Sequence, residues 1–314
     1  MKITLLEPIG IMPDVLTRIK TDLKAINHDF ISFDTRPLNE DEIIKRIADS
    51  EVVIISNLPL SEKIINSCVN LKMISVAFAG VDHIPMSLCN QKQIIVSNAA
   101  GYSNHAVAEL TIGSIISLYR KLNWCDQQTR EGLSRNGFLG SELHGKTFGI
   151  IGLGEIGQQV AKLANAFGCK VLAYNRSTKD LINIKQVALE TLLKESDIVS
   201  LHVPLTDKTK SLIGKEELSL MKPSSILINT ARGPIVNQVD LKLALQDETI
   251  AGAAIDVYEK EPPLDANHVL FDAPNSILLP HIGYATKEAI KLRGEIVIDN
   301  INKWLEGNPQ NIMN

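Results

Sequence analysis

Residues 147–157 read TFGIIGLGEIG, in which a short apolar run leads directly into the glycine pattern Gly152-x-Gly154-x-x-Gly157. The apolar run predicts a buried parallel strand, and residues 156–167 then place apolar side chains at helical spacing. In this order the first glycine allows a tight turn, the second lets backbone amides approach a pyrophosphate, and the third lets the helix pack against the strand. The stretch therefore predicts a dinucleotide site, with the pyrophosphate at a helix N-terminus.

The composition favours a soluble enzyme with two domains. The 314 residues include 32 basic and 36 acidic side chains, which gives a formal charge of −4. This balance predicts neither a nucleic acid nor a membrane partner. The N-terminal MKITLLEP predicts a short strand rather than a signal peptide, so we expect a cytoplasmic protein. Four cysteines are scattered singly, which predicts neither a metal site nor a disulfide framework: Cys68, Cys89, Cys125 and Cys169.

Short apolar runs alternate with helical patterns along the whole chain, which is typical of parallel sheets covered by helices. Besides the strand before Gly152, the expected strands are residues 2–7, 30–34, 52–56, 73–78, 94–98, 170–175, 197–203, 225–231, 252–258 and 276–281. We predict an α/β protein with two doubly wound parallel-sheet domains, a Rossmann nucleotide domain being inserted into a flavodoxin-like substrate domain.

A long helix at residues 103–122 marks the expected passage between the domains, and the segment 125–146 has no clear periodicity. A final helix over 286–305 follows the second series of strands and is expected to pack on the first domain. We assign residues 1–101 and 284–314 to the substrate domain and 102–283 to the dinucleotide-binding domain. This arrangement predicts a small-molecule site in the cleft between them.

Three polar residues follow apolar strands of the second series: Arg232, Glu261 and His281. Open α/β sheets bind ligands at the carboxyl ends of their strands. Each residue has an ordinary explanation alone, as a surface charge or a loop residue, but together they supply what carbonyl–alcohol redox chemistry needs. Histidine can move a proton near neutral pH, a carboxylate can orient the ring, and arginine can hold a substrate carboxylate. We therefore predict that these three residues are catalytic.

Five motifs are similar in sequence and order to those of the D-isomer-specific 2-hydroxyacid dehydrogenases: GLGEIG, HVPLTDKT (202–209), NTARGPIV (229–236), DVYEKEPP (256–263) and PHIGYAT (280–286). AGVDHIP (79–85) resembles the same family in the outer domain. The resemblance implies a catalytic arginine, glutamate and histidine at the three positions above, and a homodimer. It also implies that backbone amides hold the substrate carboxylate at Ala79, Gly80 and Val81.

The resemblance further implies where the cofactor is bound, with Asp256 near the nicotinamide carboxamide. The expected cofactor-binding residues are Gly152, Gly154, Glu155, Ile156, Gly157, Asn175, Arg176, Ser177, His202, Val203, Pro204, Thr209, Thr230, Ala231, Asp256 and Gly283.

The second nucleotide strand departs from the commonest pattern, because it ends in Asn175-Arg176-Ser177 instead of an acidic residue. An acid there accepts hydrogen bonds from the ribose and repels a 2′-phosphate. Without that charge, Arg176 can pair with the phosphate, and Asn175 and Ser177 can donate hydrogen bonds. We therefore favour NADP over NAD, although Arg176 could also be an exposed turn residue beside bound NAD.

The substrate is expected to be a small 2-oxo acid, first of all glyoxylate or hydroxypyruvate, which is reduced to the D-2-hydroxy acid. Phe78 precedes the loop where a phosphate-binding relative would place a basic side chain, which counts against a D-3-phosphoglycerate dehydrogenase without excluding it. This enzyme is the alternative within the family. A D-lactate-type substrate also stays open, whereas a formate dehydrogenase would carry an amide in place of Glu261. An alternative of another class is a dinucleotide-sensing binding protein without turnover.

Overall fold

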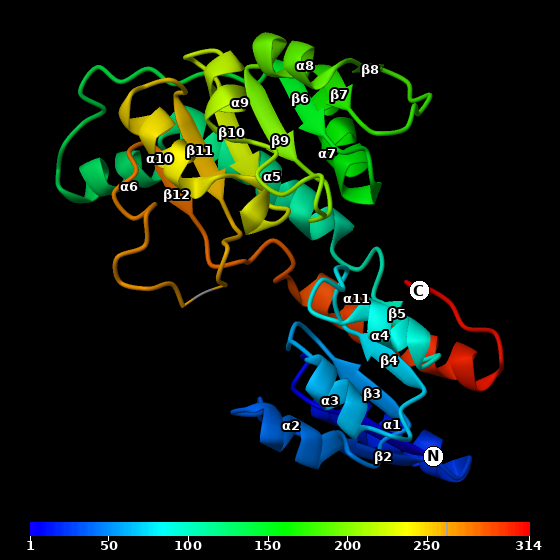
Figure 1. Cartoon of the computed structure of the whole chain (residues 1–314). Coiled ribbons are helices and arrows are strands. Elements are labelled where there is room, and N and C mark those ends of the chain that lie inside the picture. Colours follow the sequence, from blue (N-terminus) through cyan, green and yellow to red (C-terminus); the bar gives the residue numbers. More distant parts are fainter. Residues whose placement is uncertain (262) are drawn as a thin grey trace. The chain divides into compact units, whose positions relative to one another are not determined.

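The structure is a computed structural model that describes residues 1–261 and 263–314. It divides into two compact units (Figure 1). Unit 1 comprises Met1–Ser103 and Thr286–Asn314, and unit 2 comprises Asn104–Ala285. The chain therefore leaves the first unit, builds the second and returns with its last helix.

Unit 1 contains a five-stranded sheet in the order β2-β1-β3-β4-β5, and its strands pair in parallel. This is the flavodoxin-like order, as predicted. The strands are β1 (Lys2–Leu5), β2 (Asp29–Ser32), β3 (Val52–Ile55), β4 (Met73–Val76) and β5 (Ile95–Asn98). The helices are α1 (Pro13–Ala25), α2 (Glu40–Ile47), α3 (Glu62–Ser67), α4 (Met86–Gln91) and the returning α11 (Lys287–Leu305).

Helix α11 belongs to unit 1 although it follows unit 2 in the sequence. Thr286 caps its first turn by accepting from the Ala289 N–H at 3.1 Å. On its packed side, the Ser75 hydroxyl of β4 donates to the Val297 carbonyl, and the buried Asn300 donates to the Asn98 carbonyl. The helix predicted over 286–305 thus packs on the first sheet.

Unit 2 contains a seven-stranded sheet in the order β12-β11-β10-β9-β6-β7-β8, again all parallel. From β8 to β11 this is the Rossmann order, with β12 added at the edge. The strands are β6 (Thr147–Ile151), β7 (Lys170–Tyr174), β8 (Ile184–Gln186), β9 (Ile198–Leu201), β10 (Ile226–Asn229), β11 (Gly252–Ile255) and β12 (Ser276–Leu278). The helices are α5 (Asn104–Arg120), α6 (Leu122–Arg130), α7 (Glu155–Ala166), α8 (Leu189–Glu195), α9 (Lys215–Leu220) and α10 (Gln238–Gln246), with the short 3₁₀ helix η1 (Gly233–Ile235).

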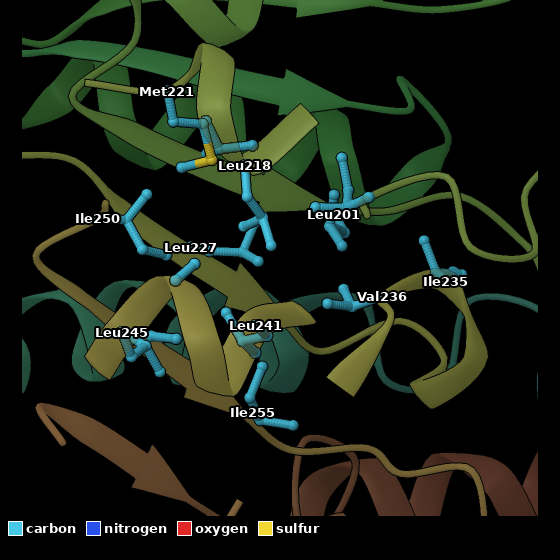
Figure 2. Close-up of a cluster of buried hydrophobic side chains, with 14 of the residues drawn as sticks. Leu201, Leu218, Met221, Leu227, Ile235, Val236, Leu241, Leu245, Ile250 and Ile255 are labelled. Atoms are coloured by element: carbon cyan, nitrogen blue, oxygen red, sulfur yellow. The ribbon is translucent and has the colours of Figure 1, made fainter. Parts of the chain in front are cut away.

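Two hydrophobic clusters cover the opposite faces of this second sheet. One packs α5 and α7 against Phe148, Ile150 and Ile228. The other packs α8, α9 and α10 against Leu201, Leu227 and other strand residues (Figure 2). Because both faces are buried, the strands are nearly continuous apolar runs, which is why the sequence predicts them.

The sequence prediction was wrong in two places. The segment 125–146 contains most of α6, and β8 was not predicted at all. None of the residues of α6 is buried, so the helix has no apolar stripe to reveal it. Polar pairs along its surface, Arg130 with Asp126 and Gln127 with Glu131, support it instead. Lys121, with φ +46°, separates it from α5, so the long predicted helix ends at Arg120.

All four cysteines are free, in agreement with their scattered spacing. Burial raises the pKa of the Cys68 thiol to about 11 and also raises the pKa values of Cys89 and Cys169. These three thiols are therefore protonated at neutral pH and poorly reactive.

Candidate active site

The glycine loop after β6 has the shape that a dinucleotide requires. Gly152 has φ +102°, and a Cβ there would meet the His202 carbonyl oxygen at 2.5 Å. A Cβ on Gly157 would come within 2.0 Å of the Gly152 carbonyl oxygen. In contrast, a Cβ on Gly154 would meet no atom of the described residues within 4 Å. Open space therefore lies against the backbone at the N-terminus of α7, where a pyrophosphate fits.

The N-terminus of α7 carries the next two expected cofactor residues. Gly154 is the N-cap, and Glu155 and Ile156 begin the first turn, whose N–H groups have no acceptor inside the helix. Ile156 packs against the hydrophobic cluster, so it fixes the helix to the sheet. The donors at this helix end thus remain available to an anion.

His202 follows β9 and lies directly beside the glycine loop. Its Nε2 is 2.9 Å from the Ser200 hydroxyl. The residue as a whole keeps some exposure, but its imidazole is enclosed, and this burial lowers the pKa of His202 to about 3. His202 is therefore neutral at physiological pH and adds no positive charge to the cofactor site.

His202 should make the protein less stable in acid. Because its folded pKa lies below its unfolded value, the unfolded chain binds a proton that the folded protein does not. Stability is then lost as the pH falls below about 6.5, at roughly 1 kcal/mol per pH unit down to about pH 4. Urea unfolding at pH 7, 6, 5 and 4 should show a shallower loss for His202→Gln than for the wild type. Equal slopes for the two proteins would contradict the assignment.

The loop after β7 holds the three residues that replace the usual acid. The Asn175 side chain accepts from the Leu153 N–H at 3.1 Å and so ties the loop to the glycine turn. Its amide donates to the carbonyl and the hydroxyl of Ser177, at 2.8 and 3.2 Å. Because these bonds use the Asn175 amide, the donors left facing solvent are the exposed Arg176 and the Ser177 hydroxyl.

Five more of the expected cofactor residues lie in loops that follow β9 and β10. After β9, the Thr209 hydroxyl donates to the Pro204 carbonyl at 2.7 Å, and Val203 packs against the cluster of Figure 2. After β10, the Thr230 hydroxyl is 3.3 Å from that of Thr111 on α5, and Ala231 donates its N–H to Asn229. Both loops thus lie at the carboxyl edge of the sheet, as the glycine loop does.

The three predicted catalytic residues follow the neighbouring strands β10, β11 and β12. His281 and Glu261 meet directly, with Nδ1 of the histidine 2.8 Å from Oε2 of the glutamate. The Tyr284 ring packs edge-on against the imidazole, with 5.5 Å between the centroids. The structure therefore places the predicted acid/base histidine and the predicted orienting glutamate in direct contact.

Residues close to Arg232 in the sequence hold it in place. Its guanidinium donates to the Ala231 carbonyl at 2.7 Å, and its carbonyl accepts from the Asn229 side chain at 2.9 Å. The next residue, Gly233, lies close to the backbone of Tyr258. A Cβ added to Gly233 would come within 2.0 Å of the Tyr258 carbonyl carbon. Asn229 and Gly233 thus fix the backbone that carries the arginine. Their residue types alone did not predict this role, although both lie within three positions of Arg232.

Asp256 supports the backbone of His281. Its two carboxylate oxygens accept from the N–H groups of Ile282 at 2.8 Å and Gly283 at 2.7 Å. His281 itself has φ +56°, a left-handed conformation that is uncommon outside glycine. Burial raises the pKa of Asp256, while the two N–H bonds act in the opposite direction. Asp256 and Gly283 were expected to contact the cofactor, and in this structure they bind each other.

In unit 1, the loop after β4 contains the three residues expected to bind a carboxylate. Asn98 donates to the Ala79 carbonyl at 2.7 Å, which fastens the loop to the end of β5. In the described part of the chain, none of the N–H groups of Ala79, Gly80 and Val81 donates to a protein acceptor. Successive unpaired N–H groups of this kind can bind an anion.

Comparison with known proteins agrees with this chemistry. The family model described as "D-isomer specific 2-hydroxyacid dehydrogenase, NAD binding domain" matches residues 112–283. The chain is 38% identical to a glycerate dehydrogenase of Methylorubrum extorquens, over 87% of this chain and 88% of that protein. It is 39% identical to a glyoxylate reductase of Thermococcus litoralis, over 86% and 84%.

A D-3-phosphoglycerate dehydrogenase of Methanocaldococcus jannaschii is 38% identical, but this chain spans only 54% of its length. Among solved structures, an acyclic imino acid reductase in complex with NADPH and D-Arg matches with a TM-score of 0.92 and 32% identity, and the match covers both chains completely. Together with the glycine cradle, these matches identify an oxidoreductase with a nicotinamide dinucleotide cofactor. The chain belongs to the D-isomer-specific 2-hydroxyacid dehydrogenase family.

Proposed function

We propose that this protein uses NADPH to reduce glyoxylate, hydroxypyruvate or a related small 2-oxo acid to the D-2-hydroxy acid. The observation that carries the proposal is the 2.8 Å contact between His281 and Glu261, at the edge of the sheet that also bears the glycine cradle. The names of the similar glycerate dehydrogenase and glyoxylate reductase support this substrate class.

The contact with Glu261 determines which nitrogen of His281 exchanges the proton. An ionised carboxylate can only accept a hydrogen bond, so Nδ1 carries the hydrogen that lies between the two side chains. Nε2 is then the atom that gives a proton to the substrate oxygen during reduction and takes it back during oxidation. Bound NADPH supplies the hydride.

The Arg232 guanidinium binds the substrate. Arg232 has a permanent planar charge that can hold a carboxylate and polarise the carbonyl beside it. In unit 1, the N–H groups of residues 79–81, which have no acceptor among the described residues, are also able to bind a carboxylate. With its carboxylate fixed, the substrate presents its carbonyl oxygen to the proton donor.

The experiment that tests the function measures initial rates at neutral pH with NADPH or NADH and a panel of 2-oxo acids. The panel contains glyoxylate, hydroxypyruvate, pyruvate, phenylpyruvate and 2-oxoisocaproate, with 3-phosphoglycerate and D-lactate tested in the reverse direction. We expect turnover of glyoxylate or hydroxypyruvate with NADPH as the better cofactor. Oxidation of phosphoglycerate in preference to the small acids would favour the second candidate, which the phosphoglycerate dehydrogenase relative suggests. Cofactor binding without turnover of any compound would point to a binding protein.

Arg176 should contribute to the preference for NADPH. An arginine–phosphate pair is strong, so Arg176→Ala should weaken NADPH binding about tenfold to 100-fold and change NADH binding less than about twofold. Fluorescence titration of the reduced nucleotides measures both affinities. An equal loss for the two nucleotides would contradict a contact with the 2′-phosphate.

We also propose that two copies of the chain associate through the region around α6. Large apolar side chains are exposed there, including Leu122, Trp124 and Leu139, which is 80% exposed. Trp124, Phe138 and Leu139 also line a hollow of about 380 Å³ in unit 2. Sedimentation equilibrium should give the mass of two chains, and Leu139→Asp should shift it towards one. A wild-type protein that sediments as a single chain would rule out the dimer.

The cytoplasmic location remains a prediction. In the described residues, no helix is both long and apolar enough to cross a membrane.

A further inference from the structure

Two cations, Arg176 and Lys179, lie in the loop after β7. In the described part of the chain, neither Arg176 nor Lys179 forms an ion pair. Other lysines of the same unit do, for example Lys194 with Glu190 at 2.6 Å and Lys222 with Asp197 at 2.9 Å. The loop has two basic residues against one acidic residue, the exposed Asp180, so its net charge is +1. Lys179, unlike Arg176, is half-buried.

The Lys179 ammonium lies against the glycine turn. Its Nζ donates to the Leu153 carbonyl at 2.7 Å. The same carbonyl accepts a second bond, from the Gln158 side chain at 3.0 Å, so it remains paired when the lysine leaves. Lys179 can thus bind another acceptor without leaving the Leu153 carbonyl unpaired.

The backbone of Lys179 is fixed although its side chain can move. Its N–H donates to the Gln186 side chain at 2.7 Å, and the Gln186 amide donates to the Ser177 carbonyl at 3.3 Å. These bonds fold the loop back on β8 and set the direction in which the lysine points. Such preorganisation lowers the cost of binding a ligand.

The position of the ammonium corresponds to the ribose end of a bound dinucleotide. In Rossmann domains the residue that ends the second strand contacts the adenosine ribose. Here that residue is Asn175, which binds the N–H of Leu153, while Lys179 binds the carbonyl of the same residue. We propose that Lys179 is a second cation that recognises the 2′-phosphate of NADPH, moving from the Leu153 carbonyl to the phosphate. This inference rests on the proposed use of NADPH.

The experiment compares equilibrium binding of four probes by titration calorimetry: NADPH, NADH, adenosine 2′,5′-bisphosphate and 5′-AMP. The last two differ only in the 2′-phosphate, so they report the contact without any turnover. Lys179→Gln should weaken NADPH and the bisphosphate about tenfold, and leave NADH and 5′-AMP within about twofold. Lys179→Arg should restore much of the loss. The matched control is Lys185→Gln, a change of the same type on β8, which should alter none of the four affinities.

Each remaining outcome has a distinct meaning. If Lys179→Gln weakens all four probes equally, the lysine only supports the glycine turn and the inference is wrong. If it changes none of them, the lysine does not contact the nucleotide, although NADPH preference through Arg176 stands. If the wild-type protein binds the bisphosphate no more tightly than 5′-AMP, the preference for NADPH itself fails, and this inference fails with it.

Discussion

Replacing His281 with asparagine is expected to lower kcat for 2-oxo acid reduction by about 100-fold to 10 000-fold, the usual range for loss of a general acid. NADPH affinity should stay within about twofold, because in the proposed mechanism the imidazole transfers the substrate proton and the glycine loop binds the nucleotide. Asparagine is the suitable replacement, since it tolerates the left-handed φ of +56° better than most residues. Steady-state kinetics and a nucleotide titration on the same sample measure the two effects.

The control for this variant is His28→Asn, a change of the same type in unit 1, where the imidazole contacts the chain N-terminus at 3.4 Å. It should leave kcat unchanged. Undiminished turnover by His281→Asn, in a protein with wild-type melting behaviour, would remove His281 from the reaction and leave the proton donor unassigned.

The second large effect is expected at Gly157, where Gly157→Ala should weaken NADPH binding by more than about 100-fold and lower the melting temperature. The added methyl group would lie 2.0 Å from the Gly152 carbonyl oxygen. Gly152 cannot retreat easily, because it packs against the His202 backbone. Helix α7 must therefore move away from the turn, which costs packing as well as the donors that face the pyrophosphate.

Gly154→Ala is the matched comparison, because its methyl group would meet no protein atom within 4 Å. It should weaken NADPH binding by occupying the space of the pyrophosphate, yet leave the melting temperature unchanged. If Gly157→Ala bound NADPH normally, the glycine loop would not be the nucleotide site. If both variants lost the same stability, the open space beside Gly154 would be in doubt.

The fold could be predicted because its strands are buried on both faces. Runs such as FGII at 148–151 are not interrupted by polar residues at alternate positions. Each is followed by a helix with one apolar side. The two elements that were missed, α6 and β8, lack this signal. The first has no buried residue, and the second is a three-residue edge strand with no fully buried side chain.

The candidate site was predictable in its residue types but not in its supporting contacts. Histidine, glutamate and arginine after the strands of a nucleotide domain indicate redox chemistry when they are taken together, and the resemblance to the family implies the same three roles. The positive φ of His281 and the two bonds that Asp256 makes to the following N–H groups are properties of the backbone. Lys179 was missed for a similar reason, because its contact with the Leu153 carbonyl depends on how the loop folds.

The left-handed torsion at His281 has a consequence for protein engineering. The imidazole is aimed by a main-chain conformation that costs an ordinary residue about 1 kcal/mol, and Asp256 holds that conformation from the neighbouring strand. A designer who grafts only the histidine and the glutamate onto another scaffold would obtain the right side chains pointing in the wrong direction. The transferable unit is the carboxylate at 256 together with the turn at 281–283, and a host scaffold must supply two adjacent parallel strands to carry them.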